Sequence, residues 1–156
     1  MAKIIIKNAE EKDSALINHL ARKCPPLDVH TPYTYWVLCQ FFNKSCFIMY
    51  DESTPIGYIT ALDTEQGTFI WQIGILESYQ GKGYASLLIE KVHNHAESRN
   101  CNMLVTIDRA NTKSYNAFKS YCQKNSLRFE ETGSLSLTDL DAPLFNENEI
   151  IYEISK

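Results

Sequence analysis

The chain has 156 residues, 44% of them hydrophobic and 22% charged, which is typical of a soluble globular domain that buries a core. Its 15 Lys and Arg against 19 Asp and Glu give a formal net charge of −4. This balance lacks the basic footprint of proteins that bind nucleic acid or an anionic membrane surface. We expect one domain spanning residues 1–156, with no nucleic-acid partner and no membrane partner.

The five cysteines are scattered and show no C-x-x-C spacing. His93 and His95 are two positions apart, so on a helix their side chains point about 200° apart and cannot share a metal ion. We therefore expect no metal site. The first residues turn acidic at once, and no apolar run approaches the ~20 residues of a membrane span. Reduced thiols in the cytoplasm are the expected setting.

The first third of the chain predicts a strand, two helices and a stiff loop. The β-branched run at 4–6 predicts a strand, and residues 10–22 predict an amphipathic helix. That helix must end before Pro25-Pro26, because a proline disfavours helical geometry in the residue before it. Residues 24–32 therefore predict an irregular loop. The nearly continuous apolar and aromatic residues at 33–42 predict a second, largely buried helix.

The rest of the chain alternates between strand-like and helix-like periods. The expected elements are strands at 46–51, 56–62 and 68–75, a helix at 85–97, a strand at 103–107, a helix at 111–125, and strands at 127–131 and 149–154. This order predicts an α/β fold in which helices cover both faces of a mixed sheet.

The segment from Trp71 to Ala85 carries the clearest chemical signal. A strand runs into a loop containing Gly81 and Gly83, and the loop opens a helix. Glycine allows close approach of the backbone to a ligand, and the free N–H groups of a helix N-terminus bind anions, so a pyrophosphate is the natural occupant. A lone Gly-x-Gly could equally shape a turn. The full Rossmann G-x-G-x-x-G and the Walker A Ser or Thr are both missing.

Gln80–Ala85 matches the Q/R-x-x-G-x-G/A signature of GNAT acetyltransferases, and Asn111 with Phe118 resembles the second motif of that family. The resemblance implies a GNAT fold: a central mixed, mostly antiparallel sheet with splayed middle strands and helices on both faces. It also implies acetyl-CoA as co-substrate, bound in the cleft between the splayed strands. The implied coenzyme-binding residues are Ile73, Ile75, Gln80, Gly81, Lys82, Gly83, Tyr84, Ala85, Asn111, Ser114 and Phe118.

Upstream, the segment Cys24–Tyr35 resembles C-P-P-L-D-V-N-S-x-Y-x-Y of the L-2,4-diaminobutyrate acetyltransferases of ectoine biosynthesis. That resemblance implies transfer of an acetyl group to the 4-amino group of L-2,4-diaminobutyrate, and it implies a homodimer. The implied substrate-binding residues are Asp28, Tyr33, Tyr35 and Trp71. An acid that holds a cation beside aromatic walls suits a small diamine. Asp28 could instead serve as a turn residue, and each aromatic residue could be core packing.

The C-terminal segment departs from the H-x-x-E pattern of these enzymes, because Phe145 stands in place of the histidine and Asn148 in place of the glutamate. His30 also replaces an asparagine. We expect Glu149 or Glu147 to supply the general base, provided that this segment is still loop, as the neighbouring asparagines suggest. A backbone N–H, that of Ile73, would polarise the thioester carbonyl.

Phe118 stands where many GNAT enzymes have a tyrosine acid, so we expect coenzyme A to leave directly as a thiolate, with a thiol pKa near ~8.5 by analogy with cysteine. Two alternatives remain open. The chain could acetylate another small amine or diamine, or it could be a non-catalytic acyl-CoA sensor that kept the glycine loop and lost the amine pocket.

Overall fold

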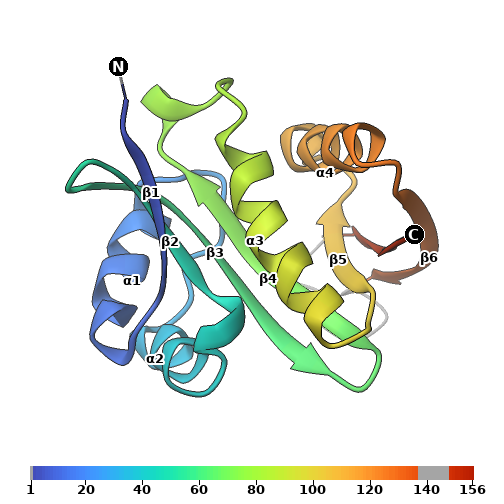
Figure 1. Ribbon diagram of the computed structural model, residues 1–156, viewed down its shortest axis with the longest axis horizontal. Coiled ribbons are helices and arrows are strands. Elements are labelled where there is room, and N and C mark those ends of the chain that lie inside the picture. The colour runs from blue at the N-terminus through green and yellow to red at the C-terminus, as the bar shows by residue number, and fades with distance from the viewer. Residues whose placement is uncertain (1, 137–147) are drawn as a thin grey trace.

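The computed structural model describes residues 2–136 and 148–156, which form a seven-stranded sheet with helices on both faces (Figure 1). The strand order is β1-β2-β3-β4-β5-β7-β6. The strands are β1 (Ile4–Asn8), β2 (Phe47–Asp51), β3 (Thr54–Thr64), β4 (Gly67–Ile75), β5 (Met103–Asp108), β6 (Arg128–Ser136) and β7 (Asn148–Ser155). The helices are α1 (Ser14–Arg22), α2 (Pro32–Phe41), α3 (Tyr84–Ser98) and α4 (Thr112–Lys124).

The expected elements are all present, with shifted ends. A 3₁₀ turn at Glu11–Asp13 precedes α1, and β6 continues past its expected end to Ser136. The strand expected at 149–154 is confirmed, but the condition set for Glu149 as the base, that its segment is still loop, is not met, because β7 already begins at Asn148. There Glu149 pairs with Asp108 of β5 and with Leu135 of β6. At Asn148, pairing with Ser136 of β6 outweighs the turn preference of asparagine.

Alternate residues of the strands pack in two cores, one on each face of the sheet. Phe47 and Met49 pack in the cluster that contains the apolar residues of α3 and α4, whereas Ile48 packs with α1 and α2. This is the period of two that a pleated strand imposes. In Figure 1, α3 crosses in front of the central strands, while α1 and α2 lie beside β1 and β2. Helices on both faces are thus confirmed.

The central strands β4 and β5 separate partway along their length. Their parallel pairing runs from Thr68–Met103 to Ile70–Val105 and ends there, while β3 remains paired with β4 up to Ile75. The other strand pairs are antiparallel. A bulge leaves Trp71 as the extra residue between Ile70 and Gln72. The mostly antiparallel sheet with splayed middle strands is therefore confirmed.

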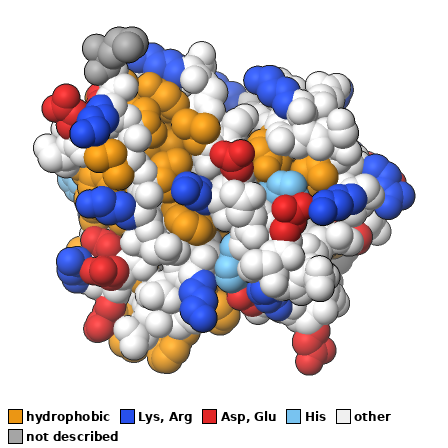
Figure 2. All heavy atoms as spheres, viewed as in Figure 1, with side chains coloured by type: hydrophobic (Ala, Val, Ile, Leu, Met, Phe, Trp, Pro, Cys, Tyr) orange, Lys and Arg blue, Asp and Glu red, His pale blue; other side chains and the backbone are white. Residues whose placement is uncertain are grey.

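Acidic and basic side chains are interspersed on the face shown in Figure 2, so this face does not carry charge of a single sign. Within residues 2–136 and 148–156, no helix is both long and apolar enough to cross a membrane.

Candidate active site

The loop between β4 and α3 has the conformation that its glycines permit. Gly81 and Gly83 have φ angles of +74° and +81°, in the left-handed region that L side chains rarely adopt. An ideal Cβ at either position would meet no described atom within 4 Å. Both glycines thus present their backbone to open space.

Gly83 is the N-cap of α3, and no side chain of the described residues caps this helix. The first turn also contains no acidic residue. The N–H groups at the start of α3 and the positive end of its dipole are therefore available to an anion, and a pyrophosphate matches them in charge and hydrogen-bonding capacity.

A cavity of about 610 Å³ lies beside this loop, and we call it the glycine-loop cavity. The residues expected to bind coenzyme A that line it are Ile73, Ile75, Gln80, Gly81, Gly83, Tyr84, Ala85, Asn111 and Ser114. Five polar lining residues on the two helices were not predicted from the sequence: Ser86, Lys113, Asn116, Ser120 and Lys124. All five belong to helices already implicated, so helical spacing from Gly83 and Asn111 was the available signal.

Two basic side chains near this loop have different surroundings. Lys113 Nζ donates to Gln80 Oε1 at 3.4 Å, while Gln80 Nε2 donates to the Ile75 carbonyl at 2.9 Å, so these contacts join α4, the loop and the end of β4. Lys82, in contrast, places Nζ 5.4 Å from the Tyr79 ring centroid and does not belong to the cavity lining. Lys113 is therefore the better-placed cation.

A second cavity, of about 550 Å³, lies between the splayed strands, and we call it the Trp71 cavity. Its wall carries three carboxylates, those of Asp28, Asp108 and Glu149, together with the imidazole of His30. No Lys or Arg occurs among its described lining residues. A wall of this composition favours a positively charged ligand.

The two cavities meet at residues that line both: Pro26, Leu27, Ile73, Asn111 and Ser114. Ile73 lies beyond the last β4–β5 pair, where the strands have separated. Asn111 caps α4, because its side chain accepts from the Ser114 N–H at 3.2 Å. Phe118 lines the Trp71 cavity from α4 and is buried, so it supplies apolar wall.

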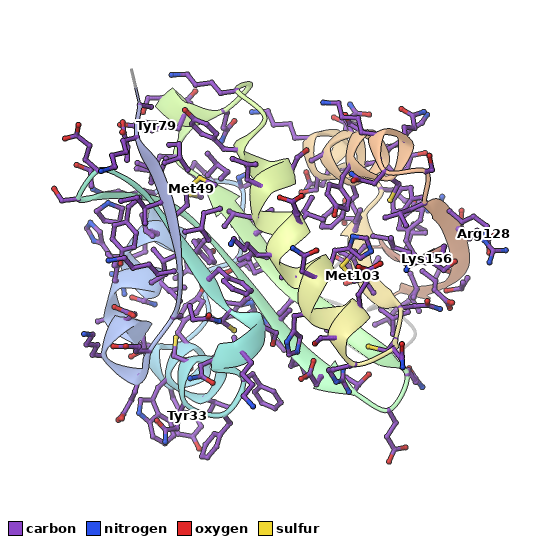
Figure 3. All side chains as sticks on the ribbon, viewed as in Figure 1. Tyr33, Met49, Tyr79, Met103, Arg128 and Lys156 are labelled. Atoms are coloured by element: carbon purple, nitrogen blue, oxygen red, sulfur yellow. The ribbon has the colours of Figure 1, made fainter. Side chains whose placement is uncertain are left out.

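The four residues expected to bind the amine are not all together. Asp28 and Trp71 line the Trp71 cavity, and Trp71 places its ring 5.5 Å from that of His30. Tyr33 is 70% exposed, stacks on Trp36 and projects from the outer side of α2 (Figure 3). Tyr35 is 0% exposed and lies outside both linings, with its hydroxyl donating to Gln72 Oε1 at 3.0 Å.

The structure brings Glu149 into the Trp71 cavity from β7, where its side chain is half-buried. Glu147 lies outside the described residues. Asp108, which the sequence analysis missed, is the cross-strand neighbour of Glu149, and its Oδ1 accepts from the Ala110 N–H at 2.7 Å. Its place directly after an apolar strand was the signal that could have identified it.

Other nucleophiles and acids are held elsewhere. Burial raises the pKa of Cys122 to about 11, so this thiol stays protonated and is a poor nucleophile. The Tyr121 hydroxyl bonds His93 Nδ1 at 2.7 Å, and Tyr115 packs on Phe129 and Tyr152. His93 and His95 have separate partners, and residues 2–136 and 148–156 contain no metal-binding group of three His, Cys, Asp or Glu.

Known proteins resemble this chain over most of its length. The model of the acetyltransferase (GNAT) family matches residues 14–122. The L-2,4-diaminobutyric acid acetyltransferase of Halalkalibacterium halodurans is 27% identical over 155 residues, covering 97% of this chain and 81% of that protein. Its counterpart from Marinococcus halophilus is 31% identical over 133 residues, covering 82% of this chain and 76% of that protein.

Among solved structures, diaminobutyrate acetyltransferase EctA from Paenibacillus lautus, in complex with its substrate L-2,4-diaminobutyric acid and coenzyme A, has the same fold. The TM-score is 0.87 at 23% identity, covering 99% of this chain and 96% of that one. The splayed strands, the uncapped N-terminus of α3 and the sequence match agree with one another. The chain belongs to the GNAT acetyltransferase family.

Proposed function

We propose that this chain transfers the acetyl group of acetyl-CoA to a primary amine of a small diamino acid, the 4-amino group of L-2,4-diaminobutyrate. The transfer is a direct attack in a ternary complex. The observation that carries this proposal is the meeting of two cavities at Ile73, one beside an uncapped helix N-terminus and one lined by carboxylates. Relatives that match most of the chain are named L-2,4-diaminobutyric acid acetyltransferases, which supports this substrate.

The glycine-loop cavity fits coenzyme A. Backbone N–H groups from Gly81 to Ala85 face the pyrophosphate, and Lys113 adds a positive charge beside it. Acetyl-CoA supplies an acetyl group activated as a thioester. The Ile73 N–H, on the part of β4 that β5 has left, polarises the thioester carbonyl.

The Trp71 cavity holds the amine. The Asp28 carboxylate binds an ammonium group, and the half-exposed Trp71 ring lies against the aliphatic stem. Tyr33 and Tyr35 do not line this cavity, so the proposal gives neither of them a contact with the amine. The wall offers acids to both ammonium groups of a diamino acid.

Glu149 is the proposed general base. A lysine-like amine with a pKa near ~10.4 costs about 4–5 kcal/mol to deprotonate at pH 7, so a carboxylate that accepts its proton through water lowers the barrier. The nitrogen lone pair then attacks the carbonyl carbon, the carbon–sulfur bond breaks, and coenzyme A leaves as a thiolate. Phe118 supplies no proton to that thiolate.

A panel assay tests the proposal. Purified protein is given acetyl-CoA with diaminobutyrate, diaminopropionate, ornithine, lysine or polyamines, and free thiol is measured. We expect the highest kcat/KM with diaminobutyrate. Preference for another amine would replace the substrate. Binding of acetyl-CoA without turnover of any amine would favour the sensor alternative.

We propose further that residues 1–156 act as one domain, because a single sheet joins β1 to β6. We also propose a cytoplasmic homodimer. Free thiols at all five cysteines support a reducing compartment, and the exposed Tyr33 and Phe41 on α2 are suited to a subunit contact. Light scattering that gives a monomer mass at micromolar concentration would refute the dimer.

A further inference from the structure

Three buried polar side chains hold the main chain of residues 28–30. Gln72 Nε2 donates to the Asp28 carbonyl at 2.6 Å, and Asn18 Nδ2 donates to the His30 carbonyl at 3.2 Å. The Tyr35 hydroxyl accepts from the His30 N–H at 3.3 Å. These contacts come from β4, α1 and α2, so three separate elements converge on one short segment.

The segment itself has no regular structure. Among the described residues, no hydrogen bond joins another main-chain group to the backbone of Asp28, Val29 or His30. Ordering a residue costs about 1–2 kcal/mol of conformational entropy, so an irregular segment adopts a single conformation only if other contacts oppose that cost. Here the three buried side chains supply them.

Gln72 is the centre of this arrangement. Its Oε1 accepts from the Tyr35 hydroxyl at 3.0 Å and from the Tyr58 hydroxyl at 2.6 Å, which leaves Nε2 to donate to Asp28. Burial raises the pKa of both tyrosines, so their hydroxyls stay protonated and remain donors. The network is buried, and among the described residues no buried side-chain nitrogen or oxygen lacks a hydrogen-bond partner.

The outer side of the same segment forms part of the Trp71 cavity. Asp28 and His30 line it, and the His30 ring packs edge-on against Trp71 at 5.5 Å. Gln72 directly follows Trp71 on β4, so one strand supplies both the aromatic wall and the group that holds the opposite wall.

We infer that Gln72, Tyr35 and Asn18 form a positioning unit that sets the Asp28–His30 segment for binding of the amine, and that Tyr35 acts through this segment without touching the substrate. This inference rests on the proposed function for its substrate. It assigns Tyr35 a role that its buried position permits.

Tyr58 offers a matched control. Its hydroxyl bonds the same Gln72 oxygen as Tyr35, and it is equally buried, but it makes no described hydrogen bond to residues 28–30. Tyr35→Phe removes a contact with the segment, and Tyr58→Phe does not. We expect Tyr35→Phe to raise the amine KM about tenfold and Tyr58→Phe to change it less than about twofold. The KM for acetyl-CoA stays unchanged in both.

A second readout does not depend on turnover. Hydrogen exchange at the His30 amide reports directly on its bond to the Tyr35 hydroxyl. We expect exchange at the His30 amide to become at least tenfold faster in Tyr35→Phe and to be unchanged in Tyr58→Phe. If the amine proposed above is wrong but this difference is found, the positioning role stands and only the substrate changes.

Gln72→Glu gives a pH signature that a purely structural role lacks. The new carboxyl keeps the acceptor for Tyr35 and Tyr58, but it can donate to the Asp28 carbonyl only when protonated. The Tyr35 and Tyr58 hydroxyls face it directly. Two further titratable groups act on Tyr35: the His30 ring, whose centroid lies 6.0 Å from that of Tyr35, and the Asp28 carboxylate, whose charge adds to the effect of burial in raising the pKa of Tyr35. We expect the ratio of variant to wild-type amine KM to fall as the pH is lowered from 9 to 6.

A double variant separates indirect from direct action. If Tyr35 acts through the segment, the double variant Asp28→Asn/Tyr35→Phe raises the amine KM over wild type by a smaller factor than the product of the two factors measured for the single variants. Multiplicative effects would mean that Tyr35 contacts the amine independently. That result, equal effects of Tyr35→Phe and Tyr58→Phe, or a pH-independent ratio for Gln72→Glu would overturn the inference.

Discussion

The glycine-loop cavity and the Trp71 cavity are neighbours that use different parts of the chain. The first contains the glycine loop within one continuous stretch, from Ile73 to Ser86, and takes the rest of its lining from residues 24–27 and from the α4 region. The second gathers side chains from distant segments, including Asp28 before α2, Trp71 on β4, Asp108 on β5 and Glu149 on β7. The anion-binding loop of the first cavity is thus local in sequence, whereas the second cavity exists only once the sheet has formed.

This difference predicts different sensitivities. A site made of backbone N–H groups depends on φ and ψ and tolerates changes of nearby side chains. A site made of side chains depends on particular carboxylates and on their protonation. The four variants below test this contrast, from the largest expected effect to the smallest.

Gly83→Val should weaken acetyl-CoA binding by about 100-fold or more, equivalent to roughly 3 kcal/mol, because valine disfavours the φ of +81° found at this position and its side chain would enter the ligand space. Calorimetry measures the affinity, and circular dichroism checks the fold. Gly133→Ala in β6 is the control, since its Cβ would make an ordinary contact of 3.6 Å with Ile151. If the folded Gly83→Val variant bound acetyl-CoA with unchanged affinity, the glycine-loop cavity would not depend on its backbone conformation.

Glu149→Gln should lower kcat by about 10²-fold, with partial recovery at high pH, because the amine then loses its proton without help. Steady-state rates between pH 7 and pH 10 measure this. Glu153→Gln, on the same strand but hydrogen-bonded to Asn102 at 2.8 Å, should keep its activity. Glu147→Gln should be nearly silent. If Glu147→Gln showed the loss and Glu149→Gln did not, the base would be Glu147.

Asp28→Asn should raise the amine KM by about 10- to 100-fold, since one charge-assisted contact is worth roughly 1.5–3 kcal/mol. The KM for acetyl-CoA should remain near the wild-type value, because Asp28 lines only the Trp71 cavity. Initial rates with each substrate varied in turn provide both constants. Equal changes in the two KM values would make Asp28 a turn residue.

Lys113→Met should weaken acetyl-CoA binding only about two- to fivefold, because an exposed charge pair is worth about 1 kcal/mol or less and is screened by salt. Calorimetry at low and high ionic strength measures the effect, which should shrink as salt is added. Lys119→Met is the control, since Lys119 lies on the same helix over the Tyr115 ring and outside the cavity. A loss of acetyl-CoA affinity as large as that of Gly83→Val would mean that charge dominates binding in the glycine-loop cavity.

Most of the fold and the loop of the glycine-loop cavity could be predicted from the sequence, because the sequence patterns that indicate them are local. The apolar run in Phe47–Asp51, the helical spacing after Gly83 and the prolines after α1 each act within a few residues. The glycine loop was recognised for the same reason. Its strand, turn and helix are consecutive, so their geometry follows from neighbouring residues.

The lining of the Trp71 cavity was predicted less completely. Tyr33 and Tyr35 share a motif with Asp28, yet α2 turns one outward and buries the other. Asparagines flank this segment in the sequence and favour a turn, yet Asn148 pairs with β6 and Glu149 pairs with both β5 and β6, so both residues are strand. Asp108 reaches the cavity because β5 lies between β4 and β7. None of these placements follows from nearby residues.

The sequence by itself determined the order of elements, the two apolar faces of the sheet and the anion-binding loop, because hydrophobic period and backbone freedom are properties of neighbouring residues. Only the tertiary structure decided which acids face the cavity and which tyrosine is buried. Strand order brings residues from positions 28, 71, 108 and 149 to one cavity, and the support that Gln72 gives to Asp28 spans 44 residues. Such contacts depend on how the whole sheet assembles.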